Sequence, residues 1–264
     1  MTGAMRQVVA FGGGGFSQES GNPLLDDYVL ALTGTANPRV CFLPTASGDA
    51  DHYLVRFYNT FRDRGRPSHV SLFRRERGVP DIRSHLLAQD LIYVGGGSML
   101  NLLAVWDAHD LGAILRLAWE RGILICGQSA GAMCWFEVGI SRGSGKARRA
   151  AGLGVLPGSC CVHYHSEPDR RRLLLESVAS SGLSGYGIDD HAALLWTDLT
   201  VGGAFSAHRG ATAYRVERGA DRVVEVPLAP TVVVPQAGDS AVPSDIAEFR
   251  RARTTAGRLA AGSR

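Results

Sequence analysis

Short apolar segments in the first half of the chain constrain its fold more than any other feature of the sequence. Each segment ends at a glycine or a turn, and its apolar residues are continuous, which is typical of strands buried on both faces of a parallel sheet. Helical patterns separate the segments, so strand, helix and strand follow one another along the chain. The segments are 7–15, 39–49, 68–75, 90–98 and 122–131.

This order predicts an α/β fold with a doubly wound, mostly parallel sheet flanked by helices. The longest helical pattern spans 98–122, where Ser98 is a suitable N-cap and apolar residues recur on one face as far as His109. After Gly152 the apolar segments are shorter and separated by turns. That change predicts antiparallel strands at one edge of the sheet in the C-terminal third.

The chain has 264 residues and shows neither an internal repeat nor a linker rich enough to mark a second domain. We therefore expect residues 1–264 to form one α/β domain. Residues from about 243 to 264 are expected to form a C-terminal helix or a frayed tail.

Composition excludes several classes of protein. The net charge is +3, and the basic residues are mixed with acidic ones, which does not favour nucleic-acid binding. No apolar run approaches the roughly 20 residues that span a membrane, and no signal peptide is evident. The five cysteines form no CxxC pair, so buried thiols and a cytoplasmic location are expected.

The glycine run 12–15 follows the first predicted strand but lacks the G-x-G-x-x-G pattern of dinucleotide-binding loops. We interpret it as a close-packed turn near the functional site. No cofactor and no metal are predicted from the sequence.

Residues 127–131, Gly-Gln-Ser-Ala-Gly, follow a buried strand and precede a helical pattern. In this context they match the G-x-S-x-G elbow, which presents a nucleophilic serine at the carboxyl end of a sheet. Ser129 is therefore a candidate nucleophile, although a serine that merely caps the following helix is the simpler alternative. The backbone N–H of Ala130 and the glycines at 95–97 are candidates for an oxyanion hole.

A serine nucleophile needs a base, and His163 and His165 lie two positions apart, on one face if the segment is a strand. Spacing alone does not choose between them. Together with Glu167 they also form a possible metal-ligand set, which we regard as the weaker interpretation because no further ligand is evident.

Several motifs in this order resemble the peptidase E (aspartyl dipeptidase) family of serine peptidases, which also includes cyanophycinase. The resemblance covers roughly residues 7–235. It implies a class I glutamine-amidotransferase-like fold and a Ser-His-acid triad. The motifs are GGGSMLNLL at 95–103, GQSAGAMCWFE at 127–137, GLGVLPGSCCVHYHSEPDRR at 152–171 and GIDDHAALLW at 187–196.

The resemblance assigns roles to particular residues. Ser129 would be the nucleophile and His163 the base, with Gly97 and Ala130 as oxyanion donors. Gly96, in the same glycine run as Gly97, is a further predicted substrate-binding residue.

The third member of the triad is not given by the resemblance, because the family's acidic loop is here the basic segment 141–150, which contains no carboxylate. Glu137, the nearest carboxylate after the serine, is our predicted acid. Glu167 and Asp190 remain alternatives.

Arginines 170–172 are expected in the first turn of a helix that begins at Pro168, where cations are electrostatically disfavoured. Arg170 and Arg171 are therefore predicted to bind a carboxylate of the substrate, and a solvated surface is the alternative.

Together these features predict a cytoplasmic serine peptidase or amidase that hydrolyses a small peptide, such as an Asp-Xaa dipeptide, through an acyl-enzyme on Ser129. A small peptide or amide is the expected partner, with neither nucleic acid nor membrane, and a homodimer is a further expectation. One alternative is a divergent amidohydrolase or acyl transferase that acts on a specialised small molecule. Another is a non-catalytic binding protein that has lost the triad acid.

Overall fold

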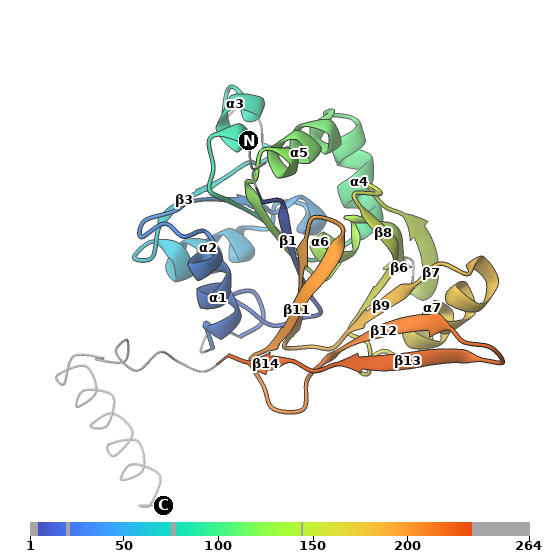
Figure 1. The fold of residues 1–264 in the computed structure, drawn as a ribbon. Helices are drawn as coiled ribbons and strands as arrows, with labels where there is room; N and C mark the ends of the chain where they lie inside the picture. The colour runs from blue at the N-terminus through green and yellow to red at the C-terminus, as the bar shows by residue number, and fades with distance from the viewer. Residues whose placement is uncertain (1–4, 20–21, 75–77, 144, 234–264) are drawn as a thin grey trace, which may run out of the picture. The chain divides into compact units, whose positions relative to one another are not determined.

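The computed structural model describes residues 5–19, 22–74, 78–143 and 145–233, and these residues contain two β-sheets with helices packed against them (Figure 1). The predicted tail at about 243–264 lies outside the described residues. The helices are α1 (Leu24–Leu32), α2 (Asp51–Phe61), α3 (Ile82–Leu87), α4 (Met99–Asp107), α5 (Leu111–Glu120), α6 (Ala130–Met133) and α7 (Pro168–Ser181).

The first sheet has the strand order β14-β11-β10-β1-β5-β4-β2-β3. Strands β1, β5, β4, β2 and β3 are mutually parallel, and β10 and β11 add antiparallel pairs beside β1. The strands are β1 (Gln7–Phe11), β2 (Arg39–Leu43), β3 (Arg66–His69), β4 (Leu91–Val94), β5 (Leu124–Gln128), β10 (Ala192–Thr197), β11 (Thr200–Ser206) and β14 (Thr231–Val232). The predicted apolar segments therefore supply the parallel strands, and the antiparallel edge is confirmed.

A second sheet, with the order β13-β12-β9-β8-β6-β7, was not predicted. After β5 and α6 the chain enters this sheet, where β6 and β8 form a parallel pair. The β8–α7–β9 crossover adds a second parallel pair, β8–β9. The strands are β6 (Phe136–Gly143), β7 (Lys146–Ala151), β8 (Leu156–Val162), β9 (Gly185–Ile188), β12 (Ala213–Arg218) and β13 (Val223–Leu228). The C-terminal third thus contributes strands to two sheets rather than to one edge.

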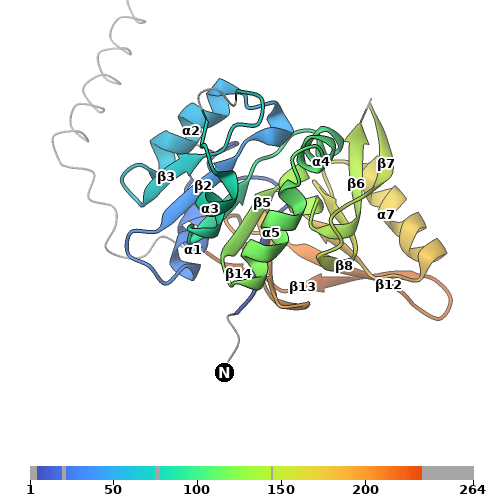
Figure 2. The ribbon, with the colours of Figure 1, turned by 90° about the horizontal axis from the view of Figure 1, so that it is seen from above.

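Both faces of the first sheet are covered, which explains its continuous apolar strands. One face carries Val9, Phe11 and Phe42 against α1 and α2. The other face carries alternate residues such as Val8 and Ile125 toward α4, α5 and the second sheet. Figures 1 and 2 show α1 and α2 on one side of the first sheet, with α7 on the outer face of the second.

The helical pattern at 98–122 forms two helices rather than one. The Ser98 hydroxyl accepts a hydrogen bond from the Asn101 N–H at 3.3 Å, as expected of an N-cap. The chain turns between α4 and α5, where Asp110 has a φ of 52°, so His109 is not part of either helix. All five cysteines are buried and free, which confirms the prediction of buried thiols.

The close packing of α6 against β4 generates a stability prediction. A Cβ atom on Gly131 would lie 2.4 Å from the Val94 carbonyl oxygen and 2.8 Å from that of Gly95. Gly131→Ala should lower the free energy of unfolding by about 3 kcal/mol or more, at the upper end of overpacking effects, because both obstacles are backbone. Urea unfolding followed by circular dichroism measures the change.

Gly96→Ala is the matched control, because its Cβ would meet its nearest neighbours at an ordinary 3.4 Å. Equal unfolding free energies for the two variants would contradict the proposed backbone clash.

Candidate active site

Ser129 lies in the sharp turn between β5 and α6, at the carboxyl end of the first sheet. Its φ of 52° and ψ of −110° are rare for a residue with a side chain. The turn is so tight that a Cβ atom on Gly127 would lie only 1.9 Å from the Gly131 carbonyl oxygen. The Ser129 N–H donates to the Phe11 carbonyl at 3.1 Å, which ties the turn to the end of β1.

His163 immediately follows β8 and has a φ of 54°. Its Nε2 lies 3.0 Å from the Ser129 hydroxyl oxygen, and its Nδ1 lies 2.5 Å from Asp190 Oδ1. Because Nδ1 faces a carboxylate, the bound proton belongs on Nδ1, which leaves the Nε2 lone pair to accept from the serine hydroxyl. This is the hydrogen-bond order of a Ser-His-Asp triad.

Asp190 reaches His163 because β8 and β9 are parallel neighbours in which Val162 pairs with Ile188. The residues that follow these two strands therefore lie side by side. The other carboxylate oxygen, Oδ2, accepts a hydrogen bond from the Ser166 hydroxyl at 2.5 Å. The hydrogen bond from His163, with a smaller contribution from Ser166, lowers the pKa of Asp190 below its ordinary value.

The structure corrects the predicted triad acid. Glu137 lies at the start of β6, and its Oε2 accepts a hydrogen bond from the Gly158 N–H at 2.9 Å. Glu167 pairs with Arg142 at 2.8 Å and with Arg170 at 3.0 Å. Proximity in sequence therefore selected the wrong carboxylate, since strand pairing brings Asp190 to the histidine instead.

Arg170 and Arg171 lie in the first turn of α7, as predicted. Arg170 is buried beside Glu167. Arg171 donates two hydrogen bonds to the Glu225 carboxylate, at 2.8 and 3.0 Å. Both guanidinium groups already have carboxylate partners within the chain, so the geometry does not favour the predicted substrate-binding role.

Glycines 95–97 directly follow β4, and Gly96 lies beside the serine. A Cβ on Gly96 would lie 3.4 Å from the Ser129 Cβ, so this glycine directly adjoins the serine. Gly97 has a φ of 140°, and a Cβ there would lie 2.2 Å from the Ala46 carbonyl oxygen. In the described part of the chain, neither the Gly97 N–H nor the Ala130 N–H donates a hydrogen bond to a protein acceptor.

The glycine run 12–15 packs closely against Asp190. This contact agrees with the interpretation of the run as a close-packed turn. A Cβ on Gly13 would lie 2.2 Å from Asp190 Oδ1. Phe16 anchors the loop, because it is buried with its ring 5.1 Å from that of Tyr93 and 5.4 Å from that of Phe42.

Sequence reasoning missed the role of Gln128, although it belongs to the elbow motif. Its Nε2 donates to the Gly14 carbonyl at 2.5 Å, and its Oε1 accepts a short hydrogen bond from the Ser17 hydroxyl. Gln128 thereby links the elbow to the glycine loop.

His165, the other candidate base, makes a separate pair in which its Nδ1 lies 2.7 Å from Asp189 Oδ1. Among the described residues, the earlier metal-ligand alternative of His163, His165 and Glu167 does not form a cluster of ligand atoms. Each of those side chains has a different partner.

These contacts define the class of the site: a serine, a histidine and an aspartate in triad order at the carboxyl edge of a mostly parallel sheet. The sequence model of peptidase family S51 matches residues 8–202, most of the chain. The chain therefore belongs to peptidase family S51, and its resemblance to peptidase E is confirmed.

A curated relative is similar to the chain in sequence, and two solved structures are similar to it in fold. The chain is 44% identical over 226 residues to the "Uncharacterized peptidase YgaJ" of Bacillus subtilis (strain 168), covering 85% of this chain and 97% of the relative. A peptidase from an acI-B1 Actinobacterium superposes with a TM-score of 0.63 at 17% identity, covering 84% of this chain and 98% of the other. A putative peptidase E from Listeria monocytogenes EGD-e gives 0.53 at 17% identity, covering 86% and 100%.

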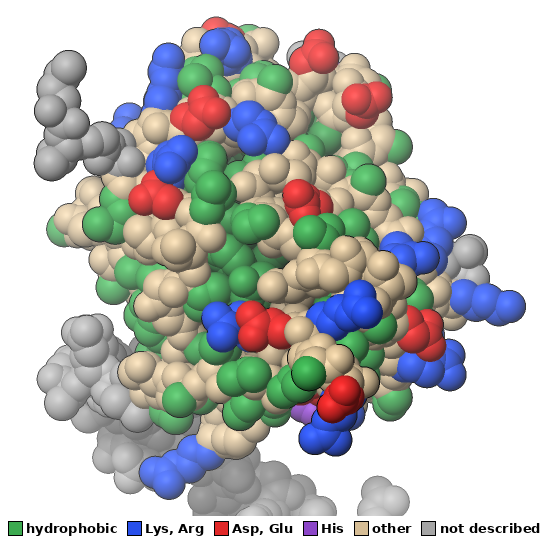
Figure 3. Space-filling model, turned by 45° about the vertical axis from the view of Figure 1, so that its right-hand side comes forward, with side chains coloured by type: hydrophobic (Ala, Val, Ile, Leu, Met, Phe, Trp, Pro, Cys, Tyr) green, Lys and Arg blue, Asp and Glu red, His purple; other side chains and the backbone are tan. Residues whose placement is uncertain are grey.

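On the face shown in Figure 3, basic and acidic side chains occur together over much of the surface. Within the described ranges, each helix is too short or too polar to cross a membrane.

The lowered pKa of Asp190 predicts a pH-dependent stability difference. A carboxylate whose pKa is lowered by folding stabilises the protein above its unfolded value of about 4, and this contribution is lost as the pH falls through the lower folded value. Asp190→Asn should therefore reduce the free energy of unfolding at pH 7. The difference in this free energy between the variant and the wild type should become smaller toward pH 3. Urea titrations across this range measure it.

Asp198→Asn is the control, because Asp198 forms an exposed ion pair with Arg6 at 2.7 Å, and such pairs contribute little. A difference for Asp190→Asn that stays constant with pH would contradict the assignment.

Proposed function

We propose that this protein is a serine-type peptidase that hydrolyses small peptides through an acyl-enzyme on Ser129. One observation carries the proposal: Ser129 Oγ, both ring nitrogens of His163 and Asp190 Oδ1 form a continuous chain with spacings of 3.0 and 2.5 Å. Family membership supports the same reaction class.

In the proposed reaction, His163 Nε2 removes the hydroxyl proton as Ser129 Oγ attacks the scissile carbonyl. Asp190 stabilises the imidazolium that forms. The N–H groups of Gly97 and Ala130, which have no protein acceptor in the described chain, are the proposed donors to the oxyanion. His163 then protonates the leaving amine, and a water molecule activated by the same nitrogen releases the acyl group.

The proposed substrate is a small peptide, with Asp-Xaa dipeptides as the first candidates. This choice depends on the resemblance to peptidase E, because Arg170 and Arg171 are already paired with carboxylates. A panel of Asp-Xaa, Glu-Xaa and Ala-Xaa dipeptides, assayed by amino-acid release, tests it. The cytoplasmic location and the homodimer remain predictions.

The alternative of a binding protein that has lost its triad acid loses its main support. That alternative requires a histidine without a carboxylate partner, whereas Asp190 adjoins Nδ1 of His163. An amidase or acyl transferase with the same nucleophile remains the second candidate, and the peptide panel distinguishes it.

Ser129→Ala should abolish labelling by a fluorophosphonate probe and reduce peptide hydrolysis by about 10³-fold or more, the usual scale for a triad nucleophile. The only atom removed is the hydroxyl oxygen, so the circular dichroism spectrum should not change. Strong labelling of wild type and its loss in Ser129→Ala are both required. Hydrolysis at the wild-type rate by the variant would refute the nucleophile.

Conservative substitutions of Asp190 and Glu137 test which of the two carboxylates acts as the triad acid. Asp190→Asn should lower kcat/KM by about 10⁴-fold, because an amide neither orients the required tautomer nor stabilises the imidazolium. Glu137→Gln retains an acceptor for the Gly158 N–H and should leave kcat/KM within a few-fold of wild type. The reverse result would restore Glu137 as the acid.

A further inference from the structure

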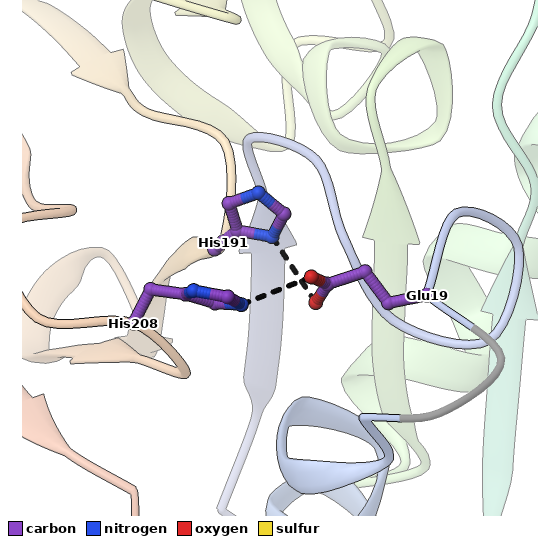
Figure 4. A group of neighbouring side chains, drawn as sticks. All are labelled: Glu19, His191 and His208. Carbon is purple, nitrogen blue, oxygen red and sulfur yellow. Dashed lines mark hydrogen bonds and ion pairs between the residues drawn. The ribbon is translucent and has the colours of Figure 1, made fainter.

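A second group of titratable side chains lies beside the triad, where three loops meet. Glu19 follows the glycine loop, His191 lies in the turn between β9 and β10, and His208 follows β11. Figure 4 shows both imidazole rings directed toward the Glu19 carboxylate. One ligand atom from each residue lies within 4.8 Å of the other two.

The carboxylate is shared between the two rings. Oε2 of Glu19 lies 3.1 Å from His191 Nδ1, and Oε1 lies 2.9 Å from His208 Nε2. The imidazole rings themselves are close, with centroids 4.2 Å apart. A single carboxylate is thus the common neighbour of both ring nitrogens.

Protein hydrogen bonds satisfy only part of this group, since His208 Nε2 is hydrogen-bonded to Glu19 Oε1 at 2.9 Å. Glu19 Oε2 and His191 Nδ1 are both buried atoms, and their mutual orientation is unsuitable for a hydrogen bond despite the 3.1 Å separation. Burying a polar atom without a hydrogen-bond partner costs stability. A cation bound to both atoms would remove that cost.

His208 Nε2 has conflicting neighbours. Besides Glu19 Oε1, it lies 3.2 Å from Asn22 Nδ2, and the Asn22 amide orientation is set by its Oδ1, which accepts from the Leu24 N–H at 3.3 Å. A neutral Nε2 that accepts from Asn22 cannot also donate to Glu19. If a metal ion takes the lone pair of Nε2, the Asn22 amide must turn aside.

We propose that Glu19, His191 and His208 bind one divalent transition-metal ion, with Zn²⁺ as the best match. Two imidazoles and one carboxylate form a recognised zinc ligand set that leaves a further position for water or another ligand. Ca²⁺ and Mg²⁺ prefer all-oxygen sites and are therefore poor matches. Nothing in this proposal depends on the peptidase activity.

The location gives the ion a positioning role. His191 directly follows Asp190, and the His191 N–H donates to the Gly13 carbonyl at 3.1 Å. An ion bound here would join the glycine loop, the β9–β10 turn and the segment after β11. It would therefore restrict the backbone that carries Asp190 without contacting the reacting atoms.

The test is direct metal titration of the chelator-treated full-length protein. We expect one Zn²⁺ per chain in a competition assay with a chromophoric chelator, and Co²⁺ should give visible d–d bands of a site with nitrogen and oxygen ligands. Glu19→Gln and His208→Ala should each weaken Zn²⁺ binding by about 10-fold or more, the scale on which altered metal sites lose affinity. Thermal unfolding should show Zn²⁺ stabilisation of wild type but not of these variants.

His165→Gln is the matched control, since it removes a histidine that is also paired with a carboxylate but belongs to a two-residue group. It should retain wild-type Zn²⁺ affinity. The proposal is overturned if the wild type does not bind one Zn²⁺ per chain. It is also overturned if Glu19→Gln and His208→Ala bind Zn²⁺ as tightly as His165→Gln does. Either result is independent of whether the protein hydrolyses peptides.

Discussion

The backbone contact between β5 and α6 is the constraint around which the site is built. Gly127 and Gly131 have no side chains, so the start of the helix passes directly over the end of the strand. The turn forces Ser129 into a positive φ, a conformation that costs of order 1–3 kcal/mol for a residue with a side chain. It persists because buried neighbours on both sides, β1 and β4, hold β5 in register.

The triad then depends on the second sheet. Ser129 ends a strand of the first sheet, whereas His163 and Asp190 follow adjacent parallel strands of the second. The shared apolar core between the sheets, which includes Phe136, Leu156 and Trp196, fixes their separation. The 3.0 Å hydrogen bond between Ser129 and His163, which follow strands of different sheets, is therefore a consequence of core packing.

Local features were readable from the sequence. The continuous apolar strands, the elbow at Ser129 and the helix starting at Pro168 each depend on neighbouring residues, and each is found in the structure. The incorrect predictions concern contacts between residues that are far apart in the sequence. The carboxylate that lies beside His163, for example, is determined by the pairing of β8 with β9. Arg171 likewise meets Glu225 from β13, a strand that no local pattern connects with α7.

Of the two adjacent aspartates that follow β9, Asp190 contacts His163 and Asp189 contacts His165. Both aspartates lie beyond Ile188, the last residue of β9, and Asp190 is in the turn that leads to β10. Asp189 turns toward His165 and also accepts from the Thr212 N–H at 3.2 Å, which ties β9 to the start of β12. The Asp190 carboxylate instead contacts His163 and Ser166. The two adjacent aspartates therefore contact different histidines: Asp189 also joins the end of β9 to the start of β12, while Asp190 adjoins Nδ1 of His163.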